Sequence, residues 1–142
     1  MIPVVGINSS SAPFMADIAA GRKRIETRNK NMLGGLVGRR VILAETKQGG
    51  YLAMCSAVIR FARPIHSREE WEELRPMHRV PAGSKYDWKD NTRVKWLYGL
   101  SSVCSLCPFL VPEGVRHGRT WMEYDRESFR IPVSSAGIAM HL

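Results

Sequence analysis

The sequence is poor in acidic residues and in long apolar runs. Only 13 of its 142 residues are Asp or Glu, against 21 Lys and Arg, so the formal net charge is +8. Such an excess of positive charge favours nucleic acid, phosphate or another anionic surface as partner. No apolar run approaches the length that crosses a bilayer, and the first residues lack the basic and then apolar order of a signal peptide. We therefore predict a cytoplasmic protein with no membrane partner.

Cysteine is also scarce, and its pattern excludes two common uses. The three cysteines are Cys55, Cys104 and Cys107, an odd number that argues against a disulfide framework. Cys104 and Cys107 have the C-x-x-C spacing, but no second such pair completes a zinc site, and the four histidines show no metal spacing. We predict small buried cysteines, no metal and no cofactor.

The order of apolar runs and turn residues predicts a β-rich α+β fold. Residues 1–142 suit a single domain, with 131–142 as a loose tail. Few helices interrupt the strands, so we expect a PUA-like β-barrel of about six strands with two or three helices packed outside. The predicted helices cover about 11–20 and a segment that begins at the capping box of Ser67 and ends before Pro76. The predicted strands cover residues 3–7, 25–28, 40–45, 51–61, 94–100, 120–124 and 129–133.

Positive charge is concentrated between residues 22 and 47. Eight basic residues lie there against two glutamates, so this window carries a net +6 of the total. The plain alternative to a binding surface is a solvated face. The basic residues are Arg22, Lys23, Arg24, Arg28, Lys30, Arg39, Arg40 and Lys47.

The sharpest local pattern is the octapeptide Gly21-Arg22-Lys23-Arg24-Ile25-Glu26-Thr27-Arg28. Lys23, just past a predicted helix end, would present a mobile ammonium to phosphate or a carbonyl oxygen, and Arg28 can bind phosphate at two points. Glu26, among cations, should stay ionised and can accept hydrogen bonds from the amino or imino edge of a base, or act as a general base. The alternative is an ordinary surface ion pair along the strand.

This octapeptide resembles the signature of the ASCH family, small domains with the PUA-like fold. The signature is a glycine, a lysine two residues on, a glutamate three further and an arginine two after that, matched here by Gly21, Lys23, Glu26 and Arg28. Residues 38–42, 94–99 and 118–124 are similar to later strands of the family, so the resemblance covers roughly residues 4 to 125. It implies a cleft between barrel and first helix, lined by Lys23 and Glu26, and a function related to RNA.

The resemblance also implies two alternative functions. One family branch hydrolyses acetylated cytidine with a threonine nucleophile, an assisting lysine and a glutamate from the second helical region. Here Glu26 occupies the threonine position, Thr27 is expected to point to the opposite face, and the third residue is not fixed among three glutamates. As an amidohydrolase or a ribonuclease, the chain would use Lys23 and Glu26 as catalytic residues; the other alternative is a protein-interaction module like the family's coregulator members. The three glutamates are Glu70, Glu72 and Glu73.

A second group of residues mixes aromatic and cationic side chains. Tyr86 and Trp88 lie in a polar loop and are candidates for stacking on bases, while Lys95 can hold phosphate. Trp71 and Trp96 are assigned to the core. The favoured function is binding of RNA or a modified nucleotide, with no prediction of oligomeric state. The candidate binding residues are Arg22, Lys23, Glu26, Arg28, Arg39, Tyr86, Trp88 and Lys95.

Overall fold

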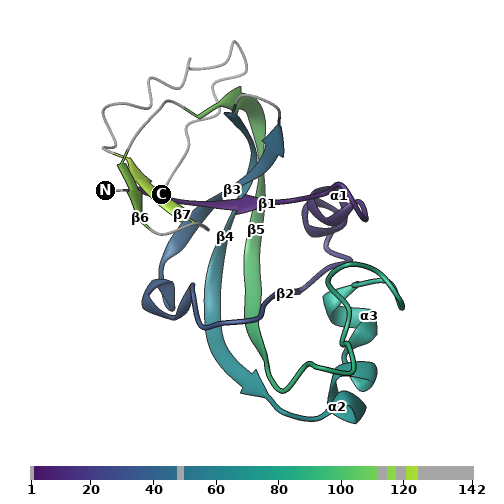
Figure 1. The fold of residues 1–142 in the computed structure, drawn as a ribbon. Coiled ribbons are helices and arrows are strands. Elements are labelled where there is room, and N and C mark those ends of the chain that lie inside the picture. Colours follow the sequence, from purple (N-terminus) through teal and green to yellow (C-terminus); the bar gives the residue numbers. More distant parts are fainter. Residues whose placement is uncertain (1, 48–49, 112–114, 118–120, 125–142) are drawn as a thin grey trace.

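The structure is a computed structural model that describes residues 2–47, 50–111, 115–117 and 121–124 (Figure 1). Its strands are β1 (Ile2–Ile7), β2 (Ile25–Arg28), β3 (Arg40–Lys47), β4 (Gly50–Ile65), β5 (Lys95–Leu110), β6 (Val115–His117) and β7 (Trp121–Tyr124). Its helices are α1 (Phe14–Ala19), the short 3-10 helix η1 (Gly34–Leu36), α2 (Arg68–Glu73) and α3 (Arg75–His78). None of the helices in these ranges is long and apolar enough to span a bilayer.

The described strands form one sheet in the order β2-β5-β4-β3-β1-β7-β6. Strands β1 and β3 pair in parallel, and every other pair in this order is antiparallel. Strands β1 to β5 make a curled half-barrel that the short strands β7 and β6 extend beside β1. The predicted β-rich α+β fold with a PUA-like barrel is confirmed, although five strands rather than six form its curled half-barrel, and the described sheet has seven strands in all. The predicted strand 129–133 and tail 131–142 lie outside the described residues.

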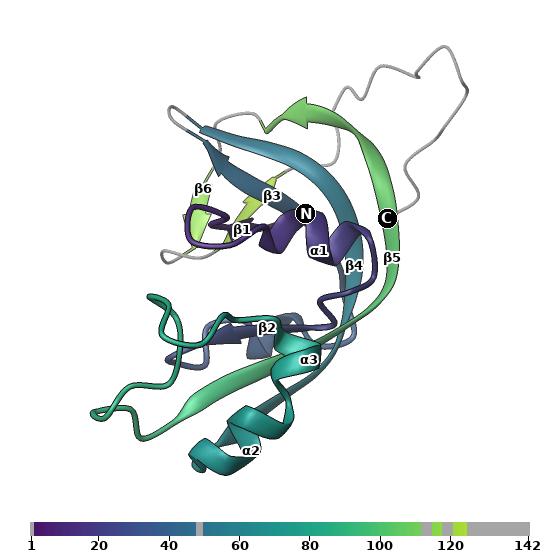
Figure 2. The same ribbon diagram turned by 90° about the vertical axis from the view of Figure 1, so that its right-hand side faces the viewer.

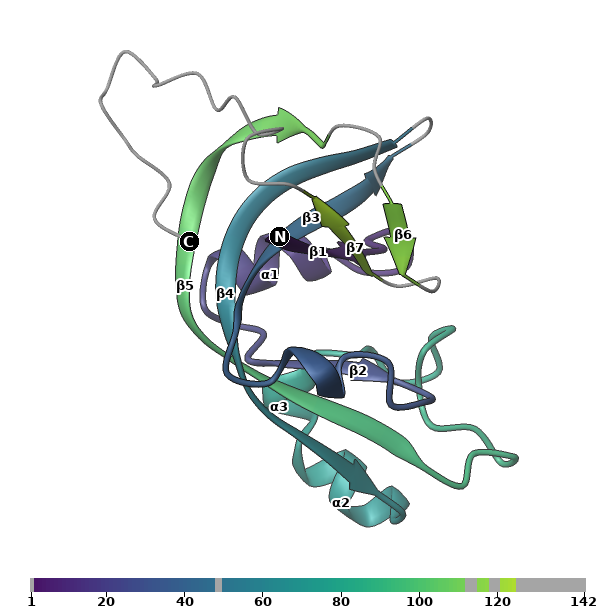
Figure 3. The same cartoon turned by 90° about the vertical axis from the view of Figure 1, so that its left-hand side faces the viewer.

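Strands β4 and β5 produce the curl. Each has 16 residues, and their pairing register shifts at three places along its length. A bulge adds a residue to one strand, so that the strand bends and its twist increases locally. Figures 2 and 3 show the result from two sides, with both strands arching around α1. The prediction of two shorter strands at 51–61 and 94–100 was therefore incomplete, because bulged strands lose the simple alternation that marks strand length.

The helix ends follow the signals in the sequence. The hydroxyl of Ser9 accepts a hydrogen bond from the Met15 N–H at 3.2 Å, at the start of α1. Gly21 follows the helix with φ at +77°, a conformation that glycine adopts without strain. The Ser67 hydroxyl caps α2 by accepting from the Glu70 N–H, as predicted. Pro76 does not end the helical region, because it lies in the first turn of α3, where proline needs no N–H partner.

The core lies inside the curl and confirms Trp71 as a core residue. Trp71 is fully buried and belongs to the main cluster, with Trp96 partly buried against it. Of the three cysteines, Cys55 is buried, as predicted, but Cys104 and Cys107 are exposed. The prediction was wrong for these two because β5 continues well past the core, and most of its residues beyond Leu100 are exposed or half-buried.

Candidate functional site

A cavity of about 870 Å³ lies between the end of β1, helix α1 and strand β2. Because β2 stands at one end of the strand order, its second edge faces this cavity rather than another strand of the described sheet. The volume falls in the range of about 300–1,000 Å³ that small-molecule sites occupy. Its lining includes Gly6, Phe14, Lys23, Glu26, Thr27, Arg28, Asn29, Lys30, Tyr51, Val80, Tyr86 and Lys95.

Lys23 lies at the base of this cavity and is held in place. Its ammonium donates to the backbone carbonyl of His78 at 2.5 Å and lies 3.6 Å from the Glu26 carboxylate. The same ammonium sits 4.7 Å from the centre of the Phe14 ring, a cation–π contact. Only 1% of the residue is exposed, so the predicted mobile ammonium is wrong. Burial lowers the pKa of Lys23 below its usual value, while the Glu26 charge opposes that shift.

Glu26 lies between two cations and remains ionised. One carboxylate oxygen accepts the Thr27 N–H at 3.0 Å, and the other lies 2.8 Å from the Arg28 guanidinium. Burial alone would raise the pKa of Glu26, but Arg28 first and then Lys23 outweigh it, so the pKa lies below its usual value. The carboxylate is therefore suited to accept hydrogen bonds from a fixed position and is poorly suited to act as a general base.

Arg28 connects β2 to β1 across the cavity edge. One terminal nitrogen donates to the Thr27 carbonyl and the other to the Gly6 carbonyl, each at 3.0 Å. Glu26 and Arg28 thus bond to the N–H and the C=O of Thr27 at the edge of β2 that faces away from β5. Thr27 itself lines the cavity, although alternation along the strand predicted that it would face away. The guanidinium is consequently tied to protein acceptors on both sides of the gap between β1 and β2.

Lys95, at the start of β5, is the second buried ammonium of the cavity. It donates to the side-chain oxygen of Asn29 at 2.8 Å and to the Tyr86 carbonyl at 2.9 Å. It also lies 5.3 Å from the centre of the Trp71 ring and is only 4% exposed. Burial lowers the pKa of Lys95, and the more distant charge of Asp87 partly offsets this.

Two aromatic side chains, Phe14 and Tyr86, share the lining with these two ammonium groups. Phe14, beside Lys23, is tilted against Tyr86, with ring centres 6.3 Å apart, and the Tyr86 carbonyl binds Lys95. The charged lining residues are four cations, Lys23, Arg28, Lys30 and Lys95, and one carboxylate, that of Glu26. The described lining therefore combines a net positive charge, one fixed acceptor and flat apolar surface.

Five of the eight predicted binding residues meet in this cavity. They are Lys23, Glu26, Arg28, Tyr86 and Lys95. Three others lie elsewhere: Arg22 pairs with Asp17 at 2.8 Å, Arg39 is exposed near the start of β3, and Trp88 packs against Trp71 with 7% exposed. Trp88 is therefore poorly placed to stack on a base. The sequence prediction placed Trp88 in an exposed loop because its neighbours are polar, but this loop packs against α2.

The three candidate glutamates of the second helical region do not join the cavity lining in the described structure. Glu70 pairs with Arg63 at 2.5 Å, and Glu72 pairs with Arg75 at 2.7 Å. Glu73 is exposed on α2. The residues missed by the sequence prediction are Phe14 and Asn29. Phe14 has the spacing of a core residue, and Asn29 directly follows the octapeptide, which was the only available signal for it.

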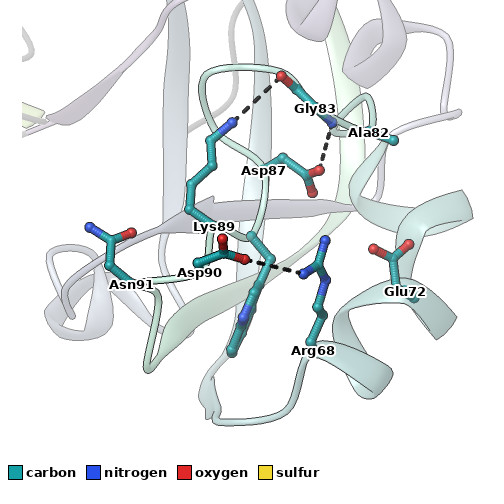
Figure 4. A pocket seen from close by; sticks show the side chains of 9 residues that line it. Arg68, Glu72, Ala82, Gly83, Asp87, Lys89, Asp90 and Asn91 are labelled. Carbon is teal, nitrogen blue, oxygen red and sulfur yellow. Dashed lines mark hydrogen bonds and ion pairs between the residues drawn. The ribbon is translucent and has the colours of Figure 1, made fainter.

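A second, more open hollow of about 550 Å³ lies between α2 and the loop that precedes β5 (Figure 4). Its charges are satisfied locally. Lys89 donates to the Ser84 carbonyl at 2.6 Å, and Arg68 lies 3.9 Å from the fully exposed Asp90. The carboxylate of Asp87 accepts the Gly83 N–H at 2.7 Å. Its one buried charge, on Asp87, is engaged by Arg75, the Trp71 indole and the Gly83 N–H, so no buried charge of the described lining lacks a partner.

A buried polar network in the core supports the position of Lys23. The side chain of His78 stacks on Trp71 and accepts the Val80 N–H at its Nδ1 atom, so its Nε2 atom carries the proton and donates to the Trp71 carbonyl. Asp87 accepts from the Trp71 indole at 2.7 Å and from Arg75 at 3.0 Å. The network fixes the turn after α3, and with it the His78 carbonyl that binds Lys23.

The arrangement of strands and helices is that of a PUA-like fold, and known structures agree with it. ASCH from Zymomonas mobilis superposes with a TM-score of 0.61 at 16% sequence identity, over 75% of this chain and 71% of that one. Structures of two single-residue mutants of the same protein superpose equally well, at 17% and 16% identity and over 72% and 73% of their chains. The chain therefore has the ASCH-domain fold. No protein-family model and no curated protein sequence matches it.

Proposed function

We propose that this protein binds RNA or a modified nucleotide through one nucleotide unit held in the cavity between β1, α1 and β2. The observation that carries the proposal is the convergence of Lys23, Glu26 and Lys95 on one hollow that Phe14 and Tyr86 also line. Cations attract the phosphate, aromatic faces stack on the base, and a fixed carboxylate accepts hydrogen bonds from the base edge.

The carboxylate distinguishes this proposal from simple phosphate binding. A buried negative charge weakens the attraction of the cleft for phosphate, so its presence favours a ligand that also offers hydrogen-bond donors. Amino and imino groups of bases are such donors. Glu26 is held ionised by Arg28 and Lys23, which makes it a constant acceptor over the physiological pH range.

Titration calorimetry with the four common nucleosides, their monophosphates and N4-acetylcytidine tests the proposal. At least one of them should bind. Tyr86→Ala should lower that affinity by roughly five- to a hundredfold, the value of one base stacked on an aromatic ring. Glu26→Gln should lower it about tenfold for ligands whose base carries an N–H donor, because a charged acceptor becomes a neutral one.

Asn91→Ala is the matched control, because Asn91 is exposed in the second hollow and lies outside the cavity. It should leave every affinity unchanged. The proposal fails if no compound of the panel binds, or if Asn91→Ala weakens binding as much as Tyr86→Ala does.

The same panel distinguishes a binder from a hydrolase. Hydrolysis in the manner of the acetylcytidine branch needs a third residue from the second helical region, and the described cavity lining contains none of the glutamates there. We therefore expect N4-acetylcytidine and short RNAs to remain intact during long incubation. Turnover that disappears in Lys23→Met would instead assign the cavity to an enzyme.

A further inference from the structure

The two buried ammonium groups of the cavity differ in how their charges are balanced. Lys23 lies 3.6 Å from the Glu26 carboxylate. Lys95 is 4% exposed against 1% for Lys23, but its hydrogen bonds go to two neutral oxygens, on Asn29 and Tyr86, and no described carboxylate forms an ion pair with it. Asp87 acts on Lys95 only from a longer distance and is itself engaged with Trp71 and Arg75.

A buried charge without a counter-ion is costly, and proteins seldom keep one without a use. Moving an ammonium out of water has a desolvation free energy of several kcal/mol. Hydrogen bonds to neutral acceptors and contact with a ring face offset only part of it. Lys95 also lines the cavity, so an anion that enters could reach it. An anionic ligand group would supply the missing charge at this position.

Asn29 adds donors at the same place. Its side-chain oxygen accepts a hydrogen bond from the Lys95 ammonium. If the amide were flipped, its NH₂ group would face the ammonium, and two donors cannot form a hydrogen bond. The amide nitrogen therefore presents its two N–H groups away from Lys95. Asn29 is exposed at the rim of the cavity, where a ligand can accept from these groups.

We propose that Lys95 and Asn29 form the anion subsite of the cavity and bind the phosphate group of the nucleotide. Lys23 and Arg28 then serve to hold Glu26, which faces the base, and the Phe14–Tyr86 pair separates the two ends. This assignment rests on the proposed nucleotide function. It narrows the expectation from the sequence, which allowed Lys23, Arg28 and Lys95 alike to contact phosphate.

The first test uses Asn29→Asp. The substitution would place a carboxylate beside Lys95 and supply the missing counter-ion from within the protein, so the fold should be kept or stabilised. Wild-type protein should bind a nucleoside monophosphate roughly ten- to a hundredfold more tightly than the matching nucleoside. Asn29→Asp should remove this difference by lowering the monophosphate affinity much more than the nucleoside affinity, and Lys95→Met should do the same.

The second test uses inorganic phosphate and needs no nucleotide. Titration into the wild-type protein should shift the side-chain amide signals of Asn29 in ¹⁵N–¹H spectra, and the shift should be absent in Lys95→Met. If phosphate shifts these signals but no nucleotide binds, the anion subsite stands and the nucleotide function fails. The affinities for 3′- and 5′-monophosphates and for a dinucleotide show whether the subsite binds a terminal phosphate or an RNA phosphodiester. Binding of either kind supports the subsite.

Three results would overturn the subsite. The first is a phosphate preference that survives both Asn29→Asp and Lys95→Met but disappears in Lys30→Met, which would place the anion at Lys30. The second is the absence of any phosphate-dependent shift at Asn29 in the wild-type protein. The third is a nucleoside affinity that falls as far as the monophosphate affinity in Asn29→Asp.

Discussion

Two buried polar networks lie side by side in this molecule and differ in what they face. In the core network of Trp71, Arg75, His78 and Asp87, the charges of Arg75 and Asp87 balance each other, although Asp87 also borders the second hollow. The cavity network of Lys23, Glu26, Arg28 and Lys95 borders a hollow of about 870 Å³. The two meet at one hydrogen bond, from Lys23 to the His78 carbonyl.

The comparison shows why buried charge alone does not identify a site. Asp87 is buried and its pKa is depressed, yet its oxygens bind the indole of Trp71, Arg75 and the Gly83 N–H. Those contacts stabilise the fold and leave little for a ligand. The cavity network has similar chemistry but borders the larger hollow. There the charge of Lys95 has no ion-pair partner among the described residues. We therefore expect changes in the core network to affect stability and changes in the cavity network to affect binding.

The largest expected effect is that of Asp87→Ala on stability. It would leave the Trp71 indole and the Gly83 N–H without their acceptor, and Arg75 would keep only Glu72 and the Val80 carbonyl as acceptors. We expect the free energy of unfolding to fall by about 3–5 kcal/mol, as when one partner of a buried ion pair is removed. Urea denaturation measures this. Asp90→Ala is the control, because Asp90 is fully exposed, and its effect should stay within about 0.5 kcal/mol. Equal effects of the two variants would contradict the comparison.

The next effect is a pH dependence that originates in the core network. Burial, with smaller contributions from the Lys23 and Arg75 charges, lowers the pKa of His78 to about 4, against the opposing hydrogen bond to Trp71. The unfolded chain therefore binds a proton at His78 below about pH 6.5, whereas the folded chain does not. Stability should be complete above pH 6.5 and fall by about 2–3 kcal/mol as the pH drops to 4.

Denaturation at several pH values between 7 and 4 measures this loss, with His78→Gln as the comparison. The variant should be less stable at pH 7 but should lack most of the decline over this interval. The pKa of Glu26 is lowered, so any loss of stability from its protonation begins only at the acid end of this interval. A decline of the same size in His78→Gln would assign the pH dependence to other groups.

The smallest expected effect is the loss of stability when a hydrogen bond at an exposed helix end is removed. Ser67→Ala removes the hydroxyl that caps α2 by accepting from the Glu70 N–H. We expect a loss of about 1 kcal/mol in the free energy of unfolding, well below that of Asp87→Ala. Ser10→Ala, at an exposed position before α1, should change stability by less than about 0.5 kcal/mol. A loss at Ser67 as large as that at Asp87 would remove the distinction between buried and exposed contacts.

Local signals in the sequence were sufficient for most of the fold. The strand at Ile25–Arg28, the end of α1 at Gly21 and the cap at Ser67 followed from neighbouring residues, and the structure confirms them. The full length of β4 and β5 did not follow, because their bulges interrupt the alternation of buried and exposed positions. The exposure of Cys104 and Cys107 depends on how far β5 extends past the core, which no local pattern encodes.

The site was only partly predictable for a related reason. Lys23, Glu26 and Arg28 lie within six residues, so their proximity could be anticipated. Their contacts could not, because the Lys23 acceptor is 55 residues away at His78 and the Arg28 acceptor is 22 residues away at Gly6. The same holds for Asn29, which owes its orientation to Lys95. Long-range contacts therefore determine which charged side chains are paired within the protein and which can bind a ligand.

The most direct test of the account is chemical-shift mapping with each of the four nucleoside 5′-monophosphates. For at least one of them, the backbone amide signals of Thr27, Asn29 and Tyr86 should move together, while those of Gly83 and Asn91 in the second hollow stay in place. Movement confined to Gly83 and Asn91, or no movement with any of the four compounds, would contradict the assignment of the cavity as the nucleotide site.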